Sequence, residues 1–211
     1  MRSYLATLGE TCSRDALTDL RLLHMGSFVP SLASATEHDA STADDRLCLR
    51  LDDVRACTAF GSLRAVHVNL AWSCVDLTDA DVLSLVSAWP LLEHLVINDR
   101  WGWRNPRGIT LQGLAEMVRR CVCLWEVCVA VDVESGAGEV RVVDLSARKH
   151  PFRLNVADSV IRREAVPALR AALSALGFTQ HSDRFSAWDG SEMGDIPGAD
   201  DYRYLWRTVF V

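Results

Sequence analysis

The chain lacks several features that would place it in a common functional class. No apolar run among its 211 residues approaches the roughly 18 residues needed to cross a bilayer, and the first residues contain no signal-peptide core. Basic residues are not in excess: 22 Lys and Arg stand against 28 Asp and Glu, a net charge of −6, so nucleic-acid binding is not expected. We therefore expect an intracellular protein, cytoplasmic or nuclear, that binds neither membrane nor nucleic acid.

Motifs of common catalytic and metal sites are missing as well. The sequence contains no GxSxG, P-loop or HExxH motif, and its six histidines are scattered singly. Its seven cysteines include Cys121, Cys123 and Cys128, which lack the paired CxxC spacing of a zinc site and read as reduced residues of an apolar core. We expect a non-enzymatic protein with no catalytic, metal or cofactor site. A metal-binding or enzymatic protein built on these three cysteines is the least favoured hypothesis.

What the chain does contain is one apolar pattern that occurs three times. The pattern is Leu63, Val66 and Val68, then Leu92, Leu95 and Ile97, then Leu124, Val127 and Val129. The copies begin 29 and then 32 residues apart, and weaker copies occur at 17–22, 154–156 and 185–187. Alternation of apolar and polar residues predicts that each copy is a strand, and strands joined by helical returns must be parallel.

The segments between the copies have the features of helices. Thr78 is the expected N-cap of the first helix, with Asp79 and Asp81 in its first turn and Pro90 after its end. A second helix is expected from Thr110 to Arg119-Arg120. Two further helices are predicted, one over Leu47–Thr58 and one over Glu164–Leu176 with Pro167 in its first turn and Gly177 at its C-terminus.

These stretches resemble the leucine-rich repeats of F-box-type proteins, particularly the large fungal sets, over roughly Leu17 to Trp188. The motifs that carry the resemblance include Phe60-x-x-Leu63-x-x-Val66, Leu77-Thr-Asp-x-Asp-Val82, Ala88-Trp89-Pro90-x-Leu92-x-x-Leu95, Ile109-Thr-Leu111-x-Gly113-Leu114 and Leu154-Asn155-Val156-Ala157-Asp158-Ser159. The resemblance implies a curved sheet that captures a protein target. It also implies an F-box that docks onto a ubiquitin-ligase scaffold, yet residues 1–16 hold too few apolar residues for F-box helices.

The expected architecture is an α/β leucine-rich-repeat solenoid of about five repeats, with a parallel sheet on the concave side and helices on the convex side. We expect one domain over residues 1–211. Within it we expect a flexible insertion at about 31–46, an irregular repeat without a helix at about 134–150, and a C-terminal cap at about 189–211. In the irregular repeat, residues 140–145 are expected to be extended.

The outer face of the sheet and one loop supply the candidate binding residues. Three rows should point outward, namely Ala65, His94, Glu126 and Arg153, then His67, Val96, Cys128 and Asn155, then Asn69, Asn98, Ala130 and Ala157. The loop at 98–107 holds two Trp and three Arg, residue types enriched at interface hot spots. The candidate partner-binding residues are Trp72, His94, Asn98, Asp99, Arg100, Trp101, Trp103, Arg104 and Glu126.

Two functional hypotheses follow, with a structural alternative for the loop. The first is a non-catalytic module that binds a protein partner through the concave sheet and the strand-exit loops. The second places the same module in an F-box ubiquitin-ligase substrate receptor whose F-box lies outside this chain. The loop tryptophans could instead cover the apolar core, and Trp89 and Trp125 are expected to be structural.

Overall fold

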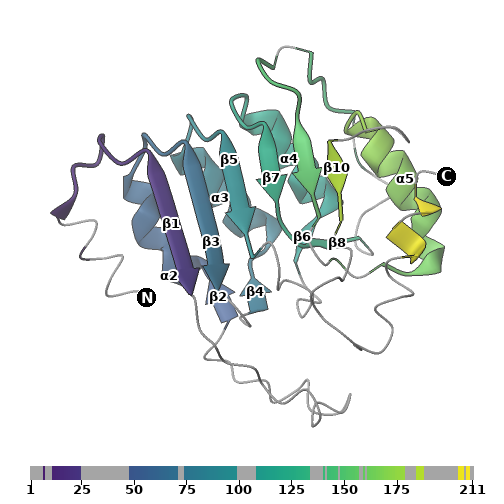
Figure 1. The fold of residues 1–211 in the computed structure, drawn as a ribbon, viewed down its shortest axis with the longest axis horizontal. Helices are drawn as coiled ribbons and strands as arrows, with labels where there is room; N and C mark the ends of the chain where they lie inside the picture. Colours follow the sequence, from purple (N-terminus) through teal and green to yellow (C-terminus); the bar gives the residue numbers. More distant parts are fainter. Residues whose placement is uncertain are drawn as a thin grey trace, which may run out of the picture.

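A computed structural model describes residues 7, 11–24, 48–70, 74–98, 108–133, 140, 142–146, 148–156, 159, 161–178, 184–187, 204–206 and 208–209. Its central element is a six-stranded parallel sheet in which the strands follow one another in chain order (Figure 1). The strands are β1 (Asp19–His24), β3 (Ala65–Leu70), β5 (His94–Ile97), β7 (Glu126–Cys128), β9 (Arg153–Asn155) and β10 (Phe185–Ser186). All lie at predicted positions, although about five repeats were expected.

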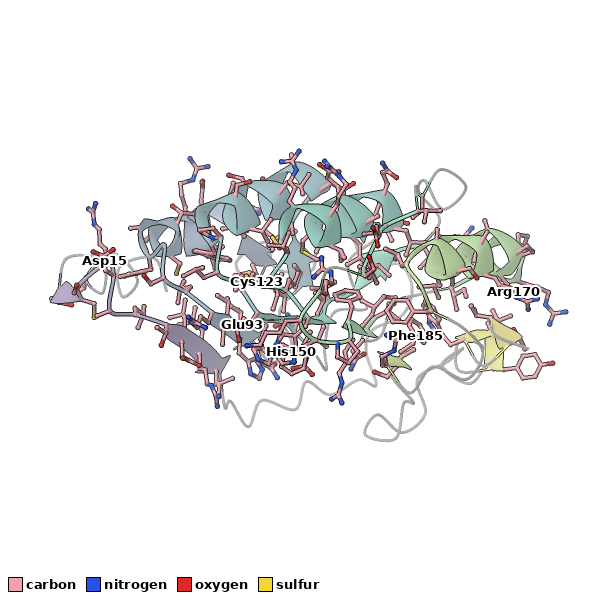
Figure 2. All side chains as sticks on the ribbon, turned by 90° about the horizontal axis from the view of Figure 1, so that it is seen from above. Asp15, Glu93, Cys123, His150, Arg170 and Phe185 are labelled. Atoms are coloured by element: carbon pink, nitrogen blue, oxygen red, sulfur yellow. The ribbon has the colours of Figure 1, made fainter. Side chains whose placement is uncertain are left out.

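Helical segments return the chain between the strands and form a second layer on one side of the sheet (Figure 2). They are α2 (Leu51–Val54), η4 (Arg55–Ala59), α3 (Asp79–Ala88), α4 (Leu111–Arg120), η6 (Arg163–Ala165) and α5 (Val166–Ala175). Two small parallel sheets join β2 (Cys48–Arg50) to β4 (Cys74–Asp76) and β6 (Ile109–Thr110) to β8 (Val131–Asp132). None of the described helices is long and apolar enough to cross a membrane.

The predicted ends of three of the four expected helices are confirmed. Thr78 Oγ1 accepts a hydrogen bond from the backbone N–H of Asp81, and Thr110 Oγ1 accepts one from Gly113. Pro167 lies in the first turn of α5, where its missing N–H costs no helical hydrogen bond. Gly177 follows α5 with φ of +81°, the left-handed conformation that favours glycine after a helix.

One local prediction is wrong. The helix expected over Leu47–Thr58 is interrupted: Cys48–Arg50 is a strand, and only α2 and η4 follow it. The extended segment expected at 140–145 contains no strand among its described residues, although the absence of a helix from the described part of 134–150 agrees with an irregular unit. The insertion expected at 31–46 lies outside the described residues.

The core lies between the sheet and the helices. The eight inward apolar positions of the strand pattern are all buried, namely Val66, Val68, Leu95, Ile97, Val127, Val129, Leu154 and Val156. Trp89 is also buried, as predicted, and its Nε1 donates a hydrogen bond to the backbone oxygen of Cys57 at 3.0 Å. Burial of this continuous apolar surface is the main stabilising contribution, because the strands are too short to be stable alone.

Aromatic residues close the C-terminal end of the core. Phe152, Phe178, Phe185 and Trp206 form a chain of rings with successive centroids 5.8 to 5.9 Å apart. Trp206 lies in the helical stretch 204–206, within the expected cap at 189–211, and its Nε1 donates to the backbone oxygen of Ser159 at 2.8 Å. The described part of the C-terminal segment therefore covers this end of the apolar core.

Candidate functional site

Residues on the outer face of the sheet lie side by side across neighbouring strands. The first row is Ala65, His94, Glu126 and Arg153, and the second is His67, Val96, Cys128 and Asn155. Both rows match the predicted register. α2, α3, α4 and α5 all lie on the opposite side of the sheet (Figure 2), so none of these four helices covers this face.

His94 and Glu126 form the centre of the first row. His94 Nδ1 lies 2.8 Å from Glu126 Oε2, and the two side chains are 33% and 40% exposed. The His94 ring meets Trp125 edge-on, with ring centroids 4.3 Å apart, and Trp125 in turn lies 5.6 Å from the His150 ring. Four polar or aromatic side chains thus form one continuous, solvent-accessible cluster.

A pocket of about 240 Å³ opens beside this cluster, at the end of the sheet where the strands begin. It is lined by Arg64, Glu93, Val122, Cys123, Leu124, Trp125, Arg148, Lys149 and His150. Figure 2 shows Glu93 and His150 close together on the sheet side of the molecule. This volume is below the range of about 300–1,000 Å³ that is usual for cofactor and substrate pockets, so the pocket suits a single side chain better than a cofactor.

Arg148 forms the inner wall of the pocket. Its guanidinium donates to the backbone oxygens of Leu124 and Val118 and lies over the Phe152 ring, 5.6 Å from the centroid. Burial lowers the pKa of Arg148, because desolvation disfavours its charged form. The segment before β9 is therefore held against the end of α4 and the start of β7 by one half-buried cation.

The predicted binding residues have different outcomes. His94 and Glu126 lie together on the exposed face. Asn98 is fully buried, with φ of +47°, so the prediction that it contacts a partner is wrong. Its backbone directly after β5 is in the left-handed conformation, which asparagine tolerates better than most residues. Trp72, Asp99, Arg100, Trp101, Trp103 and Arg104 lie outside the described residues.

The three clustered cysteines have separate environments. Cys121 and Cys128 are buried, whereas Cys123 is exposed at the pocket. Burial raises the pKa of the Cys121 thiol to about 11, as it does for Cys57, so both are protonated near neutral pH and are poor nucleophiles. Within the described ranges, no group of three His, Cys, Asp or Glu side chains is arranged to hold a metal ion.

His67 stands out in the second row. Its Nε2 is buried, and none of the described residues forms a hydrogen bond with it. An unsatisfied buried nitrogen costs about 1–3 kcal/mol. His67 therefore belongs to the outer face by register but contributes no accessible polar atom at Nε2.

The predicted binding residues did not include Trp125, Arg148 or His150, nor the rest of the pocket lining. Trp125 was expected to be structural, yet it is half-buried and separates two histidines on the exposed side. The place of Trp125 at the pocket could have been predicted from spacing, because Arg64 and Glu93 precede their strands at the equivalent positions. In the structure the backbone N–H of Trp125 bonds to the oxygen of Glu93. No sequence signal indicated Arg148 or His150, since they belong to the irregular unit.

No family model, no curated protein sequence and no solved structure matches the chain significantly. The resemblance to leucine-rich repeats of F-box-type proteins, and with it a ubiquitin-ligase role, stays a prediction.

Proposed function

We propose that the chain is a leucine-rich-repeat-type module that binds a protein partner through the outer face of its sheet. The observation that supports this most is the row Ala65, His94, Glu126 and Arg153, which is in register across four strands on the face away from the helices. The row continues into Trp125 and His150, and aromatic residues of this kind carry much of the binding energy at protein interfaces. The row carries side chains of both charge signs, which favours one complementary partner over nonspecific attraction of any oppositely charged protein.

The face contains little that would support catalysis. Of the thiols at or beside the face, Cys128 is buried and Cys123 lies at the pocket, and Glu126 is paired with His94. A parallel sheet with short strands and one continuous core supplies a rigid platform on which side chains keep fixed spacing. Rigid presentation lowers the entropic cost of binding, which suits recognition.

Paired variants test the proposal. The double variant His94→Ala/Glu126→Ala removes the contact between these two side chains from the sheet face, and Asp52→Ala/Arg55→Ala removes an ion pair of 3.0 Å from the helical side. In affinity capture from an extract of the source cells, we expect the first variant to lose proteins that the wild type and the control variant both retain. Equal capture by all three proteins, each folded by circular dichroism, would overturn the proposal.

A further inference from the structure

The pocket beside the sheet face concentrates positive charge in an otherwise acidic chain. Its lining includes three permanent cations, Arg64, Arg148 and Lys149, and one carboxylate, Glu93. The local balance is therefore +2 before His150 is counted, whereas the whole chain carries −6. Lys149 is the only lysine in the sequence. Like charges gathered around a concave site focus the electrostatic potential there, so the pocket attracts an anion.

Arg148 has no acidic partner among the described residues. Its two hydrogen bonds go to neutral carbonyl oxygens, and no described carboxylate pairs with it. A half-buried guanidinium without a counter-charge is costly, because its desolvation is not offset by an ion pair. An anion entering the pocket would offset that cost, and Arg64 and Lys149 at the rim would contribute further attraction.

The volume of the pocket and the rest of its lining restrict which anion can bind there. A volume of about 240 Å³ accommodates one side chain. Glu93 already neutralises part of this positive charge, because its carboxylate forms an ion pair of 2.7 Å with Arg64. A doubly charged phosphate would face this carboxylate, whereas a singly charged carboxylate meets less repulsion. Val122, which is 69% exposed at the rim, offers an apolar contact next to the charged group.

We propose that this pocket binds the carboxylate of an Asp or Glu side chain from an acidic segment of the protein partner, with an apolar neighbour of that residue over Val122. The carboxylate lies between Lys149 and the Arg148 wall, with Trp125 and His150 on one side. The inference rests on the proposed function, because it identifies the chemistry of the partner that the sheet face would hold.

Lys149 allows a direct test by carbodiimide cross-linking, which joins a carboxylate to a nearby amine with loss of water. The probes are short fluorescein-labelled peptides that carry Glu-Leu, Gln-Leu or phosphoserine-Leu at the same position. We expect the Glu peptide to form an amide with Lys149, mapped by peptide mass spectrometry. Lys149→Arg should abolish this cross-link while the anisotropy of the peptide still reports binding, because the positive charge is retained.

Fluorescence anisotropy measures the affinity of each peptide for the protein. The Glu peptide should bind at least about tenfold more tightly than the Gln peptide, and added salt should weaken its binding. Arg64→Glu should reduce affinity about tenfold or more, whereas Arg55→Glu, the same charge change at an exposed position on the helical side, should alter it less than about twofold.

Two outcomes would overturn the inference. One is equal binding of the Glu and Gln peptides, and the other is binding of the phosphoserine peptide alone. The peptide assay requires no natural partner, so its failure is distinguishable from failure of the proposed function. If the His94 and Glu126 variant loses its captured protein while no acidic peptide binds, only the pocket assignment is wrong.

Discussion

Asp79 accepts two hydrogen bonds from Thr110, one from its backbone N–H and one from its hydroxyl, each 2.7 Å long. Asp79 is the first residue of α3, and Thr110 is the N-cap of α4, so one carboxylate joins the starts of two neighbouring helices. Asp81, by contrast, caps its own helix by accepting from the N–H and hydroxyl of Thr78. A carboxylate at a helix N-terminus also interacts favourably with the helix dipole.

Removing this carboxylate should destabilise the fold. Asp79→Ala leaves the Thr110 N–H without its acceptor, and we expect the free energy of unfolding to fall by about 1–2 kcal/mol. Urea denaturation followed by circular dichroism measures the change. Asp52→Ala, which removes an exposed acid from the first turn of α2, should change it by less than about 0.5 kcal/mol.

Gly113 provides a stricter test, because a methyl group there would lie 1.9 Å from Asp79 Oδ1. Gly113→Ala should destabilise the wild type by displacing that carboxylate. In the Asp79→Ala background the same substitution should stabilise α4, by up to about 1 kcal/mol, since alanine favours the helix over glycine. The sign of the effect therefore depends on Asp79, and an identical effect in both backgrounds would contradict the contact.

The C-terminal segment should contribute to stability through Trp206. Trp206→Phe removes the hydrogen bond to Ser159 and should cost about 1 kcal/mol, whereas Trp206→Ala also removes ring packing and should cost about 3–5 kcal/mol. Tyr204, two residues earlier, is 62% exposed, so Tyr204→Ala serves as the control and should be nearly neutral. Similar melting temperatures for all three variants would show that this segment does not close the core.

Substitution of Gly177 should lower the stability of the fold because of its backbone conformation and not because of contacts with neighbouring side chains. At φ of +81° an alanine is strained, and Gly177→Ala should cost about 1 kcal/mol even though the added methyl would lie an ordinary 3.5 Å from Leu145. Gly61→Ala is the matched control, because its methyl would meet nothing closer than 3.9 Å. Chemical denaturation of both variants compares them, and equal stability would argue against the left-handed C-terminus of α5.

The cysteines should differ in reactivity. At about pH 8, iodoacetamide should modify exposed Cys123 at least about tenfold faster than Cys121, because the raised pKa of about 11 leaves little Cys121 thiolate. For a thiol with a raised pKa, the thiolate grows as the pH approaches 11, so the ratio of the two rates should shrink in alkaline buffer. Peptide mass spectrometry resolves the two sites. Urea should equalise their rates, and equal rates in the folded protein would contradict the burial of Cys121.

The regular parts of the fold were predictable from the sequence because they depend on local periodicity. The apolar pattern at Leu63, Leu92 and Leu124 placed three strands, and Thr78 and Thr110 marked the helix starts. Each feature depends on residues only a few positions apart. The register that aligns His94 with Glu126 also followed, since equivalent positions of a repeat face the same way in adjacent parallel strands.

The sequence alone therefore determined the parallel order of the strands, the helix ends and the outward position of His94 and Glu126. Only the tertiary structure decided that Asn98 is buried, that Asp79 bonds to Thr110, and that Arg148 and His150 come beside Trp125. These relationships join residues about 30 positions apart or follow a turn in an irregular segment. No periodic pattern specifies them, because they arise where the path of the chain departs from the repeat.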